Sequence, residues 1–267
     1  SRLTTQASPM PTISDTAVCI RRWDFSETSQ TVSLLTREHG IIRGLAKGAK
    51  REKGAFSGGL DVLTRGQVVA IVKPGRELAT LTEWHLEETY RVVRQRLDAN
   101  RAALYMVDLV HHMLTTEDPH PLVFDALVEA LGGLGDPARV GMALLLFQWR
   151  VLEEAGYRPE LDRDAETGRP LPEQEDVLAF SPRAGGFVAA PAASDHWRVR
   201  RTTRDLLRAV ASASSTSGAE AAVVRRANRL LAVYSRELIG SEPATMRWAF
   251  SDRPGRGDET SGGRGRG

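Results

Sequence analysis

Six basic side chains are concentrated between residues 37 and 53, and lysine and arginine at this density are suited to holding phosphate groups. They are Arg37, Arg43, Lys47, Lys50, Arg51 and Lys53. Glu38 and Glu52 oppose them, which leaves a local net charge of +4 in a chain whose overall formal charge is only +2. Because cations that neutralise phosphates release counterions, the cluster predicts binding to a nucleic acid backbone without regard to base sequence.

Glycines and aromatic residues accompany the basic cluster. Glycines stand at positions 44, 48, 54, 58 and 59, and glycine lets the backbone approach a ligand closely. Trp23 and Phe25 precede the cluster and Phe56 follows it, so their ring faces are candidates for stacking on bases. A charge run on a loop is usually only a solvated surface, and Trp23 or Phe56 is also compatible with a place in the core. Composition alone leaves both interpretations open.

A second basic region lies between residues 198 and 229. Its candidate binding residues are Arg201, Arg204, Arg208, Arg225 and Arg229, with Arg198, Arg200 and Arg226 nearby. Arg204 and Arg208 share a helical face because they are four residues apart. Three interpretations remain open: the arginines extend a nucleic acid path, grip an acidic peptide beside an apolar groove, or pair with the acidic middle of the chain.

Charge is strongly segregated along the sequence. Residues 12–80 hold 11 Lys and Arg against 7 Asp and Glu, and residues 196–249 hold 10 against 4. Between them, residues 81–160 hold 7 against 13, and residues 161–195 hold 3 against 7. This asymmetry predicts a polyanionic partner that contacts selected faces of the molecule.

The hydrophobic pattern predicts two domains between two disordered tails. Residues 13–82 contain five short segments typical of strands, separated by tight turns, which indicates a small barrel. Residues 83–250 are expected to be helical, with a turn-rich insertion over 158–195 that contains a short hairpin around Gly185 and Gly186, and with helix resuming from residue 196. Residues 1–12 and 251–267 are polar or low in complexity, and we expect them to be disordered.

Three helical patterns are specific enough to test. A stripe of Leu104, Val107, Val110 and Leu114 predicts one buried face, and Val223, Ala227, Leu230, Tyr234 and Leu238 predict another. The segment ALLLFQW, residues 143–149, is apolar nearly all round and predicts the helix at the centre of the core. Asp136 followed by Pro137 is typical of the start of that helix.

Several classes of function are disfavoured. No run of about eighteen apolar residues predicts a transmembrane helix, no secretory signal is visible, and we expect a cytoplasmic, nucleoid-associated protein. Cys19 is the only cysteine, which excludes an internal disulfide and a multi-cysteine metal site, and we expect it to be an inert core residue. His111 and His112 are adjacent on a helix and therefore point in different directions. No nucleophile, phosphate-loop or metal motif is present, so we predict no enzyme and no cofactor.

Four segments in the same order resemble the RecO family of bacterial recombination mediators. They are CIRRWDFSETSQTVSLLTREHGIIRGLAKGAKREKGAFSGGL, LTEWHLEETYRVVRQRLDANRAALYMVDLV, LLLFQWRVLEEAGYRPELDRDAETGRPL and FSPRAGGFV. Residues 26–29 fill the family's first turn, Gly40 fills its hairpin, and residues 46–50 fill its basic core. The resemblance covers roughly residues 13 to 250 and is spread over several motifs.

The resemblance implies an α+β fold with an N-terminal OB-fold β-barrel and an all-helical C-terminal domain with a degenerate, zinc-less loop insertion. It implies a protein that binds single- and double-stranded DNA, anneals strands, and works with RecR in RecF-type recombinational repair to exchange single-strand-binding protein for RecA. The second basic region would then grip the acidic C-terminal tail of single-strand-binding protein. The alternatives are a protein adaptor with weak DNA affinity and an RNA-binding barrel.

The chain departs from the family at a zinc site. Many members carry two CxxC pairs there, whereas this chain has Asp164, Thr167, Ala189 and Ala192 at the corresponding positions. A structural zinc site needs four ligands, and threonine and alanine cannot replace thiolates, so we predict no zinc. We expect ordinary packing to hold the loop, with Phe180, Phe187 and Val188 as candidates.

Overall fold

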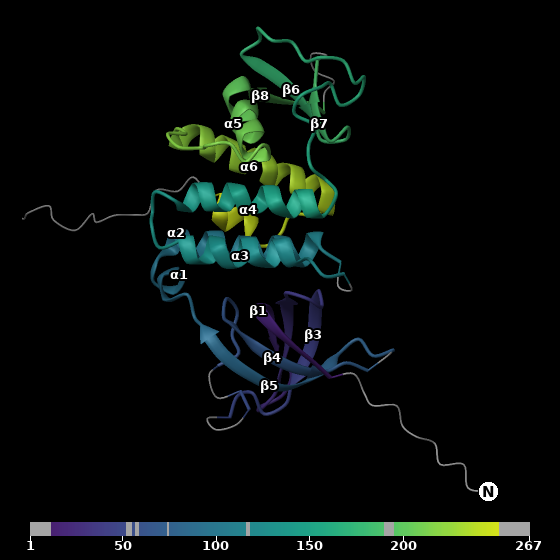
Figure 1. Ribbon diagram of the computed structural model, residues 1–267, viewed down its shortest axis with the longest axis vertical. Coiled ribbons are helices and arrows are strands. Elements are labelled where there is room, and N and C mark those ends of the chain that lie inside the picture. The colour runs from purple at the N-terminus through teal and green to yellow at the C-terminus, as the bar shows by residue number, and fades with distance from the viewer. Residues whose placement is uncertain are drawn as a thin grey trace, which may run out of the picture.

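The computed structural model describes residues 12–51, 55–56, 59–73, 75–115, 118–189 and 195–250. A β-barrel lies at one end of an elongated molecule, helices form the middle, and a small sheet lies at the far end (Figure 1). The predicted disordered tails fall outside the described residues, except for Thr12. Among the described helices, none is long and apolar enough to cross a membrane.

Five strands close into a barrel in the order β1-β2-β3-β5-β4. The strands are β1 (Thr12–Asp24), β2 (Gln30–Thr36), β3 (Ile41–Ala46), β4 (Arg65–Ile71) and β5 (Ala79–Glu88). β3 and β5 pair in parallel, and the other neighbouring strands pair antiparallel. The predicted barrel is therefore confirmed and is OB-like in its five strands, although β5 continues past the boundary expected at residue 82.

Alternating side chains fill the barrel. On β3, Ile42 and Ala46 point inward and belong to the barrel core, whereas Arg43 is exposed. Gly44 occupies the inward position between them, where an added Cβ would lie 2.6 Å from a methyl carbon of Leu81. Glycine at this position therefore allows β3 and β5 to approach closely. The turn between β2 and β3 closes at Gly40, whose φ of 69° favours glycine.

Seven helices follow among the described residues. They are α1 (Arg91–Gln95), α2 (Leu97–Met113), α3 (Pro121–Gly133), α4 (Val140–Glu154), α5 (Arg201–Ala211), α6 (Ala221–Ile239) and α7 (Met246–Ala249). α4 packs against α2, α3 and α6, which confirms the prediction that the most apolar helix is central. It begins at Val140 rather than Pro137, because residues 136–139 form a separate turn in which the Asp136 carboxylate accepts the Ala138 N–H.

The two predicted buried stripes are confirmed in their main residues. On α2, Val107 and Val110 are buried, and on α6, Ala227, Leu230 and Tyr234 are buried. The partly buried ends of the α6 stripe pack against the same core as its centre. Helical periodicity thus predicted these faces correctly.

The C-terminal region is not all helical, which corrects the prediction. The insertion and the residues that follow it form a three-stranded sheet in the order β7-β6-β8, made of β6 (Val177–Ser181), β7 (Gly186–Val188) and β8 (Trp197–Arg200). β6 and β7 are the expected hairpin, but β8 was expected to be helical. Val199 is buried between two exposed arginines on β8, a period-two pattern that favours a strand.

Aromatic packing holds the small sheet to the helices. Phe180 and Phe187 are fully buried, and their rings meet edge to face with centroids 5.3 Å apart. Phe180 also stacks on Trp197 and contacts the ring of Tyr234 on α6. Val188 is buried beside them, so the three residues predicted to hold this loop by packing are confirmed as core residues.

A carboxylate organises the loop in which the resemblance places two cysteine pairs. Asp164 Oδ1 accepts the N–H groups of Glu166 (2.9 Å) and Thr167 (2.8 Å), and Oδ2 accepts that of Ala189 (2.7 Å). The N–H of Ala189, together with those of Thr167 and Glu166, holds the pKa of Asp164 below its usual range. Because the carboxylate is already occupied and Ala189 offers no side-chain ligand, the described residues do not fit a zinc ion; Ala192 lies outside them.

We predict that Asp164→Asn destabilises the protein by about 1–3 kcal/mol, since the amide nitrogen cannot accept the Ala189 hydrogen bond. The folded-state pKa is depressed, so the stabilisation is fully present above the unfolded value of about 3.9 and is lost as the pH falls through the lower folded value. Urea unfolding of both proteins at neutral pH and below pH 4 measures the difference.

Asp162→Asn is the matched control for this experiment. Asp162 is exposed, and its carboxylate pairs with Arg208 at 2.7 Å on the surface. Its replacement should change the free energy of unfolding by no more than about 0.5 kcal/mol. Equal effects of the two substitutions would show that the Asp164 hydrogen bonds are not what stabilises the loop.

Candidate nucleic-acid interface

The outward-facing side chains of β1, β2 and β3 form rows across the barrel. In the first row, Leu35 of β2 lies opposite Val18 of β1 and Ile41 of β3. All three belong to the core shared with the helices. This end of the barrel face is therefore covered by the helical region.

The next two rows carry the polar and aromatic side chains. Ser33 of β2 lies between Arg21 and Arg43, and Thr31 lies between Trp23 and Leu45. Trp23 is 40% exposed and Arg43 is exposed. The barrel face thus changes from apolar and covered to cationic and then to partly aromatic with increasing distance from the helices.

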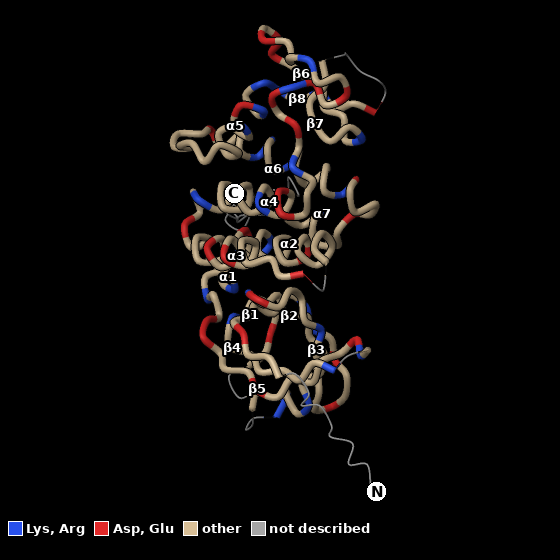
Figure 2. Tube along the Cα trace, turned by 45° about the vertical axis from the view of Figure 1, so that its right-hand side comes forward, with Lys and Arg blue, Asp and Glu red and all other residues tan. Residues whose placement is uncertain are grey.

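The segment after β3 brings further cations to the exposed end of this face. Lys47, Lys50 and Arg51 are all exposed. The Lys50 N–H donates to the Thr28 carbonyl (3.1 Å), and the Gly48 N–H donates to Ser29 Oγ (3.3 Å). These bonds tie the basic segment to the turn between β1 and β2. Figure 2 shows lysine and arginine along β3 and at the end of the barrel that faces away from the helices.

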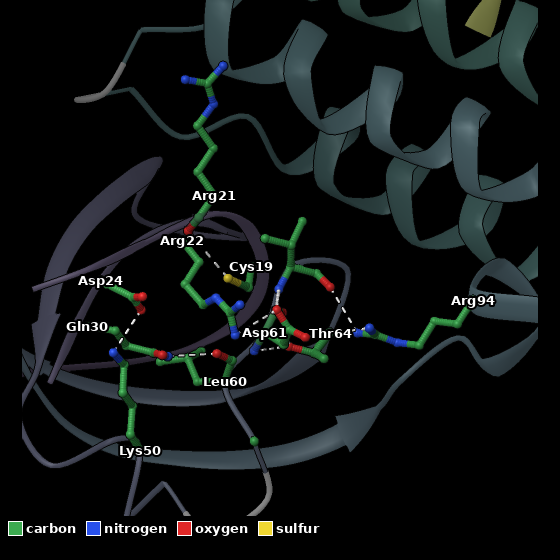
Figure 3. A network of polar contacts seen from close by, with 12 residues as sticks. Cys19, Arg21, Arg22, Asp24, Gln30, Lys50, Leu60, Asp61, Thr64 and Arg94 are labelled. Atoms are coloured by element: carbon green, nitrogen blue, oxygen red, sulfur yellow. Dashed lines mark hydrogen bonds and ion pairs between the residues drawn. The ribbon is translucent and has the colours of Figure 1, made fainter. Parts of the chain in front are cut away.

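The cations differ in what they contact. Lys50 Nζ lies 2.9 Å from an Asp24 carboxylate oxygen (Figure 3). It also donates to the Ser26 carbonyl. Arg43, Lys47 and Arg51 form no ion pair with any other described residue. These three are therefore the predicted site residues whose charge is available to a ligand, while Lys50 is partly neutralised. Lys53 lies outside the described residues.

The charge of Arg37 is already paired with a carboxylate of the helical region. Its guanidinium donates from Nε and Nη2 to the two carboxylate oxygens of Asp125 on α3, at 3.0 and 2.9 Å, and from Nη1 to Glu38. The hydrogen bonds and charge of Asp125 raise the pKa of Arg37 above its ordinary value. The arginine joins the β2–β3 turn to the helices, so we leave it out of the interface.

The predicted aromatic residues differ in their exposure to solvent. Phe56 is only 6% exposed and packs in the barrel core with Trp84. It cannot present a ring face to a base, so its predicted stacking role is withdrawn. Phe25, in the turn after β1, is 62% exposed. Together with Trp23 it supplies the accessible aromatic surface of this face.

Sequence analysis missed two cations in the loop between β4 and β5. Lys73 and Arg76 lie in this loop, which rejoins the barrel at Ala79 beside Gly44 of β3. Neither forms an ion pair with another described residue. The available signal was the sequence KPGR, in which two basic residues flank a proline and a glycine typical of a turn.

The barrel and helices are joined around the Asp108 carboxylate of α2. Arg21 Nη2 donates to Oδ1 (2.6 Å), and the hydroxyl and N–H of Thr245 donate to Oδ2 (2.8 and 3.2 Å). Burial tends to raise the pKa of Asp108, but the hydrogen bonds from Arg21 and Thr245 outweigh it and lower the pKa. In Figure 3, Arg21 points toward the helices, whereas Arg22 points the opposite way.

The histidines near this junction do not form a metal site. The pKa of His111 is lowered to about 4, first by burial and then by the positive charges of Arg21, His112 and Arg43. It is therefore neutral at pH 7. No group of metal-binding side chains occurs in the described part of the chain.

Cys19 is buried in the barrel core, and burial raises the pKa of its thiol.

The arginines of the second basic region lie at two different sites in the structure. Arg225 and Arg229 line a groove of about 480 Å³ between α2, α4, α6 and α7, together with Trp248 and Phe250. The other three predicted residues are engaged within the small-sheet region. Arg204 is buried and pairs with Asp205, Arg208 pairs with Asp162, and Arg201 donates to the carbonyls of Pro172 and Glu175.

This combination of features narrows the class of protein. A closed five-stranded OB-like barrel with unpaired cations on its outer face, followed by a helical region, is typical of proteins that handle nucleic acids. Residues 10–90 match the family model described as "Recombination protein O N terminal", and residues 94–246 match "Recombination protein O C terminal". The chain therefore belongs to the RecO family of DNA repair and recombination proteins, which confirms the resemblance seen in the sequence.

Curated relatives agree with the family models. The chain is 36% identical over 172 residues to the DNA repair protein RecO of Rhodopirellula baltica, a match that covers 64% of each chain. It is 35% identical to that of Salinibacter ruber over 73% of each chain. A match to that of Anaeromyxobacter sp. strain Fw109-5 is 30% identical and covers 91% of this chain and 97% of the relative.

The structure predicts different effects for two arginines. Arg37→Gln should leave DNA affinity unchanged, because its charge is already matched by Asp125, whereas Arg43→Gln should weaken DNA binding. Fluorescence anisotropy with a labelled oligonucleotide measures both. Asp125→Asn is the control for Arg37, and a double-mutant thermal cycle should show coupling between them. Equal loss of affinity in both arginine variants would place Arg37 at the interface after all.

Proposed function

We propose that this chain is a DNA-binding recombination mediator. In this proposal it binds single- and double-stranded DNA, anneals complementary strands and, with RecR, helps exchange single-strand-binding protein for RecA. Membership of the RecO family supports DNA interaction, and the partners follow from the family resemblance alone. Annealing needs only charge neutralisation and proximity of the strands, so the proposal requires no cofactor and no catalytic residue.

The observation that supports DNA binding most directly is the set of cations beside β3. Arg43, Lys47 and Arg51 are exposed and lack ion pairs among the described residues, although carboxylates elsewhere on the barrel do pair with arginines. Trp23 and Phe25 lie on the same face or its adjoining turn. Phosphates would satisfy the cations, and bases would cover the exposed rings.

The charge of this face is tested by the double variant Lys47→Gln/Arg51→Gln. If each residue neutralises one phosphate, the slope of log affinity against log salt should become shallower by about 1.4 for single strands and about 1.8 for duplex. Anisotropy titrations over a series of salt concentrations measure the slope. Both side chains are exposed, so a thermal melt should show a folded protein.

Arg169→Gln/Arg183→Gln is the matched control. Both arginines are exposed and lie in the small-sheet region, at the opposite end of the molecule from the barrel (Figure 1). This variant loses the same formal charge and should keep the original salt slope. Identical slopes for all three proteins would contradict DNA binding by the barrel face.

A second candidate function is docking of the acidic C-terminal tail of single-strand-binding protein. The groove lined by Arg225, Arg229, Trp248 and Phe250 supports it, because arginines beside an apolar surface suit an acidic peptide with an aromatic end. Arg201, Arg204 and Arg208 are not part of this proposal. Arg208 pairs with Asp162 of the insertion, which agrees with the alternative that some arginines pair with the acidic middle of the chain. Arg201 donates to backbone carbonyls of the insertion, and Arg204 pairs with Asp205 on its own helix.

We predict that Arg225→Glu/Arg229→Glu weakens binding of an acidic peptide ending in phenylalanine by at least about tenfold, the effect of one lost charge-assisted hydrogen bond. Calorimetric titration with the synthetic peptide measures it. Arg208→Gln should bind the peptide normally and so serves as the control. Unchanged affinity in the double variant would exclude the groove as the docking site.

A further inference from the structure

A hollow lies where the β1–β2 turn meets the segment after β3. Its volume is about 320 Å³, and its lining includes Phe25, Thr28, Ser29, Leu45, Lys47 and Arg51. This volume is at the lower end of the range found for small-molecule sites. The hollow therefore suits one small, flat group with an adjoining charge rather than a long segment of chain.

Backbone hydrogen bonds fix both walls of the hollow. The Phe25 N–H donates to the Ser29 carbonyl (3.1 Å), which closes the turn that carries the ring. The Arg51 N–H donates to the Gly48 carbonyl (3.0 Å), and Gly48 adopts a φ of 73° that favours glycine. The bond from the Gly48 N–H to Ser29 Oγ joins the two walls. The ring and the two cations are thus held near each other without any ligand.

The chemistry of the hollow combines an exposed ring with unpaired positive charge. Phe25 is 62% exposed, the highest value among the large aromatic side chains of the described residues. No other described ring stacks on it. Lys47 and Arg51 flank it without ion pairs to described residues. A phosphate satisfies the cations, and a planar base satisfies the ring, so a nucleotide suits both parts of the hollow.

We propose that this hollow is a subsite for one unpaired nucleotide, with its base stacked on Phe25 and its phosphate between Lys47 and Arg51. The proposal rests on the proposed DNA binding and adds selectivity to it. In a duplex both faces of a base are covered by neighbouring bases, so only an unpaired base can stack on the ring without the cost of unstacking. The cations contact the backbone of either form.

This selectivity has a consequence for annealing. A single strand on the barrel gains both the charge contacts and the stack, whereas the paired product keeps only the charge contacts. Pairing therefore removes one favourable contact between DNA and protein at this subsite. The subsite holds the reactant strand more tightly than the product duplex, which favours release of the product.

Phe25→Ala tests the subsite. It should weaken binding of a short mixed-sequence single strand by about 5- to 150-fold, the range for one base–aromatic stack. It should leave unchanged the affinity for a relaxed circular duplex, which has neither ends nor unpaired bases, and the salt slope for both ligands. An abasic single strand keeps its phosphates without base faces, so it should bind Phe25→Ala and the original protein equally.

Two further variants separate stacking from other roles of the ring. Phe25→Trp should retain single-strand affinity, and Phe25→Leu, which is apolar but has no ring face, should lose it. Tyr157→Ala is the control, because Tyr157 is also an exposed aromatic residue but belongs to the helical region. Thermal melts should show all variants folded.

The outcomes separate this inference from the proposed function. If Phe25→Ala weakens single-strand and duplex binding equally, or weakens neither, the nucleotide subsite is refuted while DNA binding stands. The same holds if the loss persists with the abasic strand. If Lys47→Gln/Arg51→Gln also leaves both affinities and both salt slopes unchanged, the DNA-binding proposal itself fails.

Discussion

The strand register of β1, β2 and β3 is the constraint on which the candidate interface depends. Successive side chains of a strand point to opposite faces. In β1 an irregularity between Cys19 and Arg21 shifts this alternation, so that Val18 and Arg21 both lie on the outer face. Across these strands the outward residues become, in order, apolar, cationic and aromatic. A shift of one residue in any strand would bury the cations and expose the core. The barrel core and the outer face are thus specified by one pattern.

Much of the fold was predictable because it follows from short-range periodicity. Alternation gave the barrel strands, and the α6 stripe through Ala227, Leu230 and Tyr234 gave a buried helix face. β8 was missed because its four residues adjoin the arginine-rich start of α5, and the alternation around Val199 is too short to stand out. The start of α4 was displaced because the Asp136–Pro137 pair, a common helix start, here begins a separate turn.

The site residues were predictable as a set but not one by one. Composition identifies a basic cluster, yet it does not show that Asp125, 88 residues away in sequence, accepts the Arg37 guanidinium. Nor does it distinguish Phe56, which turns into the barrel, from Phe25, which stays exposed in the turn. Such assignments depend on contacts between distant segments. The same limit applies to Asp164, whose role appears only when its bonds to Thr167 and Ala189 are seen together.

The Asp108 carboxylate has a mechanical consequence. It accepts bonds from Arg21 in the barrel and from Thr245 just before α7, and it belongs to α2. Rotation of the barrel against the helices would remove the Arg21 donor from a buried anion, which is unfavourable. The exposed barrel face and the groove beside Trp248 are therefore carried on one frame at a set spacing. A DNA strand bound to the barrel face and a peptide bound in the groove would therefore be held at a fixed distance and orientation relative to each other.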